Sequence, residues 1–418
     1  MTTDAEPDAA AEARPGGGPG GGPDGTPDGT VWDRVIGHAD QVRTLRQALD
    51  SGQVAHAWLF TGPPGVGTLD IARAFAAALN CENTTGAAAD GTCPSCRRVL
   101  RGVHPDVHLV EAEGEVLRVE EVRGAREEAW RSRQEGRTAV FILDEADRMN
   151  EFAANALLKV LEEPPPHVVF VLVARGTAAL LDTITSRARL VPFGELPPET
   201  LAAGLARELG VDLDRATWAA TAGHGHLDRA RALLGDASAR DRRGRVLDLF
   251  GQIVGSTPAD ALAAVATVTA TGDDALTVLK ERHAVELADL EETFGKGRGS
   301  AAVRNRVLQR QHRAERRVRF DAIREAVTDL LAACRDAAAV ATAGPGASLI
   351  HLDRAEQASD LARAGAAASL RAAAALVEAE RRLSIGSSPQ LTCESALLAV
   401  QAAFAGQPAE LTRIDLRR

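Results

Sequence analysis

Aromatic residues are scarce in this chain of 418 residues: they make up 3% of it, and tyrosine is absent. Because 45% of the residues are still hydrophobic, we expect a core built mainly of Ala, Leu and Val. The five cysteines are an odd number, and no basic segment followed by an apolar one opens the chain. These features argue against a disulfide framework and a secretory leader, and they predict a protein of the reducing cytoplasm.

Long apolar runs and an excess of positive charge are also lacking. No stretch approaches the ~20 apolar residues that span a bilayer, so we expect no membrane partner. The net charge of −10 argues against nucleic-acid binding by the surface as a whole. Residues 1–30, rich in Gly, Pro and acids, are predicted to be disordered, because they cannot bury enough apolar surface to offset their ordering entropy.

The clearest motif is the glycine loop Gly62-Pro-Pro-Gly-Val-Gly-Thr-Leu69. It lies between an apolar run at 56–60 and a helical pattern at 69–79, which is the strand–loop–helix setting of a phosphate-binding loop. The glycines that can cradle a phosphate are Gly62, Gly65 and Gly67.

The polar residues of a working phosphate-binding loop are missing. The Lys and the Ser or Thr that should follow Gly67 are replaced by Thr68 and Leu69, and Asp70 brings a negative charge to a helical turn that favours anions. Arg73 is the nearest cation and is too far along the helix to replace the Lys. The backbone cradle is therefore present without the cation or the Mg²⁺-binding hydroxyl.

A second nucleotide signature is Val140-Phe-Ile-Leu-Asp-Glu-Ala-Asp147. Asp144 and Glu145 follow four apolar residues, so both carboxylates lie at the C-terminal end of a predicted strand. In an ATPase the first orients Mg²⁺ and the second polarises water. A solvated strand end is the alternative interpretation, but the position downstream of a glycine loop favours a nucleotide site.

The order of predicted elements indicates an α/β fold. Strands at 56–60, 107–110, 139–143, 168–173 and 190–193 alternate with helical patterns that include 39–49, 69–79, 116–133 and 150–163. Strands that are apolar throughout predict a parallel sheet covered on both faces. We expect a sheet domain at 31–196 with a Cys-containing insert at 81–104, a small helical lid at 197–237, and an all-helical domain at 238–418 that is interrupted near 295–299 and 344–346.

Six segments carry a resemblance to a known family: Val35–His38, Ala55–Gly65, the cysteine insert at 81–104, Leu143–Asp147, Asn155–Pro165 and Thr183–Arg187. They resemble the clamp-loader subunits of the AAA+ family, and among these the delta-prime group of bacterial DNA polymerase III. The resemblance implies a P-loop NTPase-like core, a lid and a helical oligomerisation collar within a DNA-replication complex. It also implies motor and clamp-opening subunits as partners, and the sliding clamp and primed DNA as indirect ones.

The resemblance further implies that Ser186 and Arg187 act in trans, with Arg187 reaching ATP held by a neighbouring subunit. The alternative is a surface Arg in an intramolecular ion pair. Besides the loop, two further positions depart from the motor subunits of the family. The position after the predicted strand at 168–173, where motors place a polar sensor, reads Ala174-Arg175. The lid has Asp228 where a nucleotide-sensing Arg is expected, with Arg229 one residue later. We therefore expect a stator with weak or absent ATP binding and no ATPase activity of its own. The alternative is an ATP-hydrolysing motor subunit.

A cysteine insert predicts a metal site. Related subunits carry four cysteines there and bind zinc, and this chain keeps their spacing as Cys81-x8-Asp90-x2-Cys93-x2-Cys96. Zinc accepts a carboxylate oxygen, so a structural site of three Cys and one Asp is chemically allowed. His104 is another candidate ligand, and a decayed site with free thiols is the alternative. Cys334 and Cys393 are expected to be small core residues.

Residues 296–319 hold nine basic residues and one acidic residue. One hypothesis is contact with DNA phosphates or an acidic partner. The other is a solvated helix or a flexible linker, since residues 295–300 resemble a loop and no aromatic residues are interleaved for base stacking. A free-standing zinc and nucleic-acid module is a third functional class, which the long helical domain disfavours.

Overall fold

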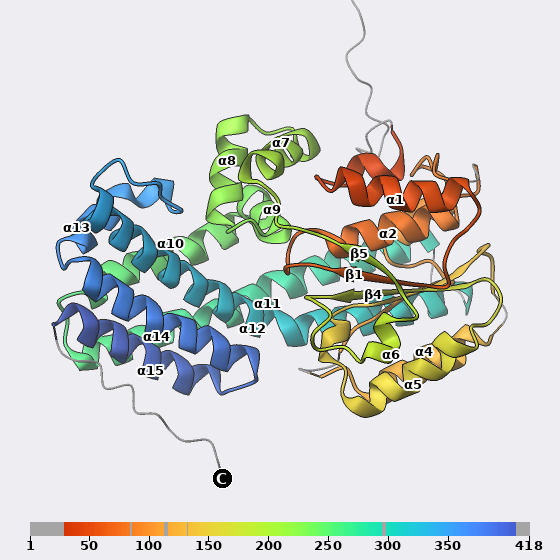
Figure 1. The fold of residues 1–418 in the computed structure, drawn as a ribbon. Coiled ribbons are helices and arrows are strands. Elements are labelled where there is room, and N and C mark those ends of the chain that lie inside the picture. The colour runs from red at the N-terminus through yellow and green to blue at the C-terminus, as the bar shows by residue number, and fades with distance from the viewer. Residues whose placement is uncertain (1–28, 84–85, 113–115, 132, 295–297, 407–418) are drawn as a thin grey trace, which may run out of the picture.

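A computed structural model describes residues 29–83, 86–112, 116–131, 133–294 and 298–406. The segment predicted to be disordered lies, except for its last two residues, outside the described residues. Figure 1 shows an α/β half and an all-helical half, with three short helices between them.

The sheet has five parallel strands in the order β2-β3-β4-β1-β5. They are β1 (Ala57–Thr61), β2 (Val107–Val110), β3 (Ala139–Leu143), β4 (Val168–Ala174) and β5 (Arg189–Pro192). Each lies where the sequence predicted a strand, to within two residues. β1, β3 and β4 are buried along their whole length, whereas the edge strands β2 and β5 are partly exposed, so burial on both faces holds only for the central strands.

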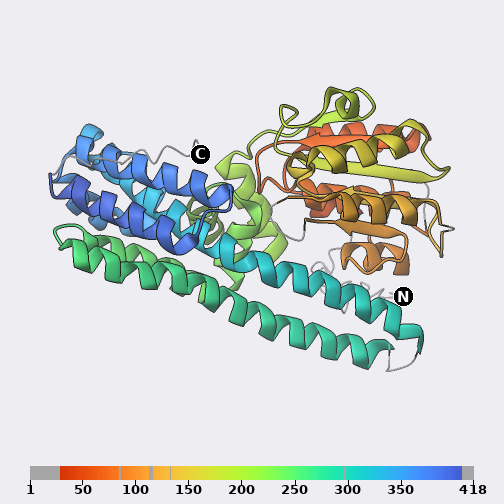
Figure 2. The ribbon, with the colours of Figure 1, turned by 90° about the horizontal axis from the view of Figure 1, so that it is seen from below.

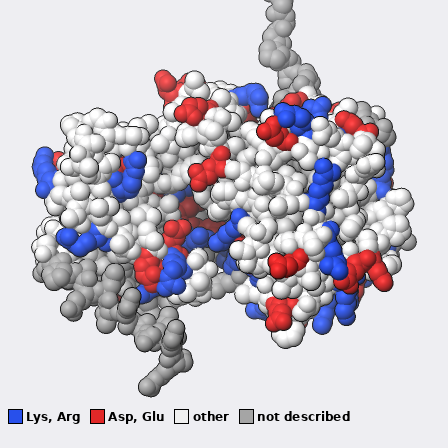
Figure 3. Space-filling view, viewed as in Figure 1, with Lys and Arg blue, Asp and Glu red and all other residues white. Residues whose placement is uncertain are grey.

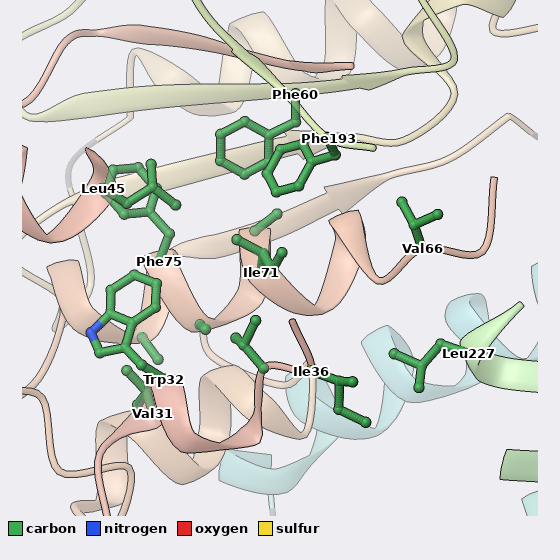
Figure 4. Packing of buried hydrophobic residues seen from close by; sticks show 14 of the residues in the cluster. Val31, Trp32, Ile36, Leu45, Phe60, Val66, Ile71, Phe75, Phe193 and Leu227 are labelled. Atoms are coloured by element: carbon green, nitrogen blue, oxygen red, sulfur yellow. The ribbon is translucent and has the colours of Figure 1, made fainter. Parts of the chain in front are cut away.

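Alternate side chains of the central strands point to opposite faces of the sheet. Trp58 and Phe60 face one hydrophobic cluster with α1 (Ala39–Asp50), α2 (Thr68–Leu79) and α3 (Pro94–Leu100). Figure 4 shows Phe60 and Phe193 above Ile71 and Phe75 of this cluster. On the other face, Leu59 and Phe141 pack with the second set of helices: α4 (Val119–Ala129), α5 (Glu151–Glu162) and α6 (Asp182–Thr185).

The starts of helices α4 and α5 can be compared with the predictions from the sequence. The pattern at 116–133 predicted too long a helix: α4 begins at Val119, because Leu117 forms an isolated parallel bridge with Met149. The predicted cap of α5 is present, since the Asn150 side chain accepts a hydrogen bond from the N–H of Ala153 at 2.8 Å.

The three helices between the halves are α7 (Pro198–Leu209), α8 (Leu213–Ala222) and α9 (Leu227–Gly235). They share the hydrophobic cluster of α1 and α2. The approach is close: a Cβ on Gly204 of α7 would lie 2.4 Å from Ile36. The lid is therefore packed onto the sheet domain through apolar contacts.

The C-terminal half is helical throughout its described part: α10 (Ala237–Ile253), α11 (Pro258–Phe294), α12 (Arg298–Ala343), α13 (Ala355–Ala362), α14 (Ala366–Ser384) and α15 (Pro389–Phe404), with a 3₁₀ turn at Leu352–Arg354. A core around Phe250 and Leu330 holds these helices together. Cys334 and Cys393 are buried in it, which confirms them as core residues.

Helices α11 and α12 form an antiparallel pair that extends beyond the bundle and along the sheet domain (Figure 2). We call residues 273–294 of α11 and 298–324 of α12 the arm. Residues 298–300 are helical, so the loop expected at 295–300 is wrong for that part, and 295–297 lie outside the described residues.

One described stretch, Pro258–Asp289, is long and apolar enough to cross a membrane by length and composition, contrary to the expectation from the sequence. Its most apolar window has a mean hydropathy of 1.3 and is 33% buried. Ala261, Val265 and Val268 of this stretch belong to the helical core, and core helices of water-exposed domains pass the same test.

Candidate nucleotide cleft and flanking sites

The glycine loop connects β1 to α2, as the sequence predicted, and the lid covers it. Gly65 and Gly67 have φ of +79° and +89°, a conformation that favours glycine. The N–H of Leu227 donates a hydrogen bond to the carbonyl oxygen of Gly65 at 2.7 Å. A Cβ on Gly65 would lie 2.2 Å from Nδ1 of His226, so the start of α9 rests directly on the loop.

The lid also supplies a cation to the first turn of α2. The Arg231 guanidinium lies 2.6 Å from the Asp70 carboxylate, 3.0 Å from Glu208 and 3.2 Å from Asp228. The sequence directed attention to Asp228 and Arg229 instead, and Arg229 pairs with the buried Asp329 of α12 at 2.6 Å. The lid arginine at the cleft is therefore Arg231, bound to a carboxylate of the same chain.

Asp144 and Glu145 lie at the end of β3, as predicted. Burial, aided by the nearby carboxylate of Glu111, raises the pKa of Asp144 to about 6, although Arg317 opposes the shift. Arg317 of the arm contacts Glu145 and lies 3.7 Å from Glu111. The basic stretch thus finds an acidic partner within its own chain.

Other arginines of the basic stretch are paired in the same way. Arg313 approaches Glu111 at 3.8 Å, Arg310 contacts Glu286 of the arm, and Arg319 contacts Asp273. The sequence missed these partners, and the only signal for them was the concentration of bases at 296–319. The side chains of Arg310, Arg313 and Arg317 are 24–28% exposed, whereas that of Arg319 is 57% exposed, as the hypothesis of a solvated helix expects.

The loop, the acids and the arm enclose a cleft of about 260 Å³. In addition to Arg73, its wall includes Arg317 and Arg324, two cations that are remote from the loop in the sequence. The cleft is therefore lined by cations other than Arg73, which the sequence did not indicate. Figure 3 shows acidic and basic side chains gathered in the hollow between the two halves.

Arg175, at the predicted sensor position, is paired with a carboxylate of the same chain. The Arg175 N–H donates a hydrogen bond to Asp147 at 3.2 Å, and its guanidinium lies 3.9 Å from the same carboxylate. Asp147 belongs to the motif that follows β3. The side chain at the sensor position is thus bound to Asp147.

Arg187 and Ser186 lie at the end of α6, on the exposed surface of the sheet domain. The Arg187 guanidinium forms an ion pair with Glu162 at 2.9 Å and donates a hydrogen bond to the Thr183 carbonyl at 3.0 Å. The side chains of Arg187 and Glu162 are 36% and 51% exposed, so the pair is strongly screened.

The cysteine insert brings its four candidate ligands together. One ligand atom each from Cys81, Asp90, Cys93 and Cys96 lies within 4.8 Å of the others. Although burial opposes it, hydrogen bonds from the Asn83 side chain and the backbone of the loop lower the pKa of Asp90 to about 2.

This donor set fits zinc. Three sulfurs and one carboxylate oxygen at these separations match a closed tetrahedral site, and the N–H groups of Glu82 and Cys96 donate to the Cys93 sulfur as outer-shell partners do. His104 is not part of the cluster: its ring nitrogens bond to the Ser95 hydroxyl and the Asp106 N–H.

A parallel sheet with a glycine loop after one strand, paired carboxylates after another and a small helical lid is the architecture of the AAA+ class. Within this class, residues 37–197 match the family described as "DNA polymerase III, delta subunit". Over these residues the chain is therefore similar to subunits of DNA polymerase III.

The relatives include both gamma/tau and delta' subunits of DNA polymerase III. The chain is 37% identical over 188 residues to DNA polymerase III subunit gamma/tau of Mycobacterium tuberculosis, which covers 44% of this chain and 32% of the relative. It is 35% identical over 160 residues to DNA polymerase III subunit delta' of Bacillus subtilis, which covers 38% of this chain and 48% of the relative. The match thus spans about a third to a half of the curated relatives.

Solved structures are more distantly similar. The Bacillus subtilis DNA clamp loader delta protein is 14% identical with a TM-score of 0.32, covering 86% of this chain and 99% of its own. A Thermotoga maritima RuvB variant is 17% identical with a TM-score of 0.35, covering 66% of this chain and 88% of its own.

Proposed function

We propose that the chain is a delta-prime-like stator in a cytoplasmic bacterial clamp loader. In this role it binds motor and clamp-opening subunits, does not hydrolyse ATP itself, and supplies Arg187 to ATP held by a neighbour. The observation that carries the proposal is the occupation of the cleft by the chain's own charges: Arg231 on Asp70 and Arg317 on Glu145.

Arg187 suits a role in trans for physical reasons. An arginine is always charged, and its planar fork can bind two oxygens of a phosphoryl group. Its partner Glu162 is half exposed, and such surface pairs contribute only about 0–1 kcal/mol. A triphosphate presented by a neighbouring subunit can therefore displace Glu162 at little cost.

An ATP-hydrolysing motor is the alternative function. The relatives named gamma/tau favour it, whereas Thr68 in place of the loop Lys disfavours it. Arg317 and Arg324 reach the cleft from the arm, but Arg317 is already bound to two carboxylates. A cation held in this way is not available to the phosphates.

We also propose that Cys81, Asp90, Cys93 and Cys96 hold a structural zinc ion. When bound, zinc would cross-link the insert and stabilise its fold. The residues around it contribute without the metal as well: the Trp32 indole N–H donates a hydrogen bond to the Ala87 carbonyl at 2.9 Å, which anchors the insert to the start of the sheet domain.

The test of the stator function is ATPase activity of the reconstituted loader. The full chain alone should show no turnover, and Arg187→Ala should lower the rate constant at the neighbouring ATP site by about 10³-fold. Arg43→Ala, which removes an exposed arginine on α1, is the matched control and should leave that rate unchanged. Steady hydrolysis by the isolated chain, or an unchanged rate with Arg187→Ala, would contradict the proposal.

A further inference from the structure

Two ion-pair bridges cross the cleft at places where nucleotide-binding loops meet charged ligand groups. Asp70 is in the first turn of α2, where the helix N-terminus stabilises an anion such as phosphate. Its carboxylate lies 2.6 Å from Arg231 of the lid. An anion of the chain itself thus joins the loop helix to the lid.

The second bridge joins the sheet to the arm. Glu145 is the second of the paired carboxylates and follows Asp144, the one that would orient a divalent cation in an ATPase. Arg317 contacts it and also approaches Glu111 at 3.7 Å, so a guanidinium neutralises both carboxylates. Arg313 approaches Glu111 at 3.8 Å from one helical turn earlier in α12.

We infer that the arm closes the cleft from within the chain, and that Asp70 and Arg317 take the electrostatic places of phosphate and metal. The lid and the arm are then held on the sheet domain without any nucleotide. The inference rests on the proposed function only in that the cleft is treated as a nucleotide site that has lost its ligand.

The burial of these groups makes the bridges effective. The side chains of Arg317 and Glu145 are 25% and 26% exposed, and those of Arg231 and Asp70 are 24% and 30% exposed. Removing the arginine of either pair leaves a partly desolvated carboxylate with a weaker set of partners: Glu145 keeps Arg148 at 2.9 Å, and Asp70 keeps Arg73 at 3.9 Å. Each bridge should therefore resist opening more strongly than a surface pair does.

Hydrogen–deuterium exchange on the full chain tests this inference directly. We expect Arg317→Ala to speed exchange about tenfold in two segments, residues 143–149 and 310–320, since partly buried ion pairs couple their partners on this scale. Arg319→Ala is the matched control: it removes an arginine two positions away that pairs with Asp273 within the arm, where both side chains are more than half exposed. It should leave exchange at 143–149 within about twofold of the unaltered chain.

A double-mutant cycle keeps the result decisive. Glu145→Gln should speed exchange of the same segments. Combining it with Arg317→Ala should add less than the full effect of each change, because both break the contact between Arg317 and Glu145, whereas the contacts of Arg317 with Glu111 and of Glu145 with Arg148 are each lost in only one of them. Unchanged exchange with Arg317→Ala, or effects of the two changes that multiply in full, would overturn the inference. If Arg317→Ala does not fold, Glu145→Gln alone decides: exchange at 310–320 within twofold of the unaltered chain would refute it. These readouts are independent of loader ATPase, so a failed stator role and a failed closure are distinguishable.

Discussion

Asp144 should make the stability of this protein depend on pH in a defined direction. Its carboxyl group lies at the end of β3, and burial raises its pKa from 3.8 to about 6. A group whose pKa is higher in the folded state stabilises the fold when it is protonated. Its contribution is therefore complete below pH 4 and is lost as the pH rises through about 6.

The size of the effect follows from the pKa difference. A rise of this size, which already includes the opposing charge of Arg317, corresponds to about 3 kcal/mol, and the residual solvent access of Asp144 reduces it to about 2 kcal/mol. Asp144→Asn keeps the shape and removes the charge. We expect the variant to be more stable than the unaltered chain by this amount at pH 8. The difference should be clearly smaller at pH 4.5, where only the unfolded carboxyl, with a pKa of 3.8, is largely ionised.

Denaturant unfolding of both proteins at pH 4.5, 6, 7 and 8 measures this difference. Comparing the two proteins cancels other titrating groups, such as His226, whose pKa burial lowers to about 4. Asp40→Asn, at an exposed carboxylate on α1, is the matched control for removing a carboxylate from the surface. A difference for Asp144→Asn that is the same at pH 4.5 and pH 8, or that favours the unaltered chain at pH 8, would refute the reasoning.

The remaining predictions concern the loop and the insert. Gly65→Ala should destabilise the protein by about 1–3 kcal/mol in denaturant unfolding, because the new methyl group would lie 2.2 Å from His226 Nδ1 and the backbone has a positive φ. Gly52 also has a positive φ but open space around it, so Gly52→Ala measures the backbone part of this cost. Protein prepared without chelator should contain about one equivalent of zinc by atomic emission, and Cys93→Ser should lose it, whereas Cys393→Ser should not. Less than about a tenth of an equivalent in the unaltered chain would indicate free thiols.

The sheet domain could be read from the sequence because its signals are local. Each central strand is a short apolar run between turn residues, and parallel strands buried on both faces carry that pattern. The loop after β1 and the acids after β3 follow from the same runs. Even the cap at Asn150 was visible, because a cap acts within one helical turn.

The charge partners could not be predicted because they join distant parts of the chain. Arg231 follows Asp70 by 161 residues, and nothing near Arg231 in the sequence distinguishes it from Arg229. The basic stretch was conspicuous, but a run of bases does not indicate which acids it faces. Only the course of α12 along the sheet domain places Arg317 at Glu145.

The same chain thus uses arginine in two physically different ways. Arg231 is shared among three carboxylates and Arg317 between two, so moving either one would leave several acids with fewer cationic partners. Arg187 has one half-exposed carboxylate and one carbonyl, and water can replace both. A charge that is held by several buried partners stabilises one conformation, whereas a charge that is held weakly at the surface can be transferred to a partner. The number and burial of the acids around each arginine therefore favour Arg187, and not the arginines of the cleft, as the residue that this protein can offer to a neighbouring subunit.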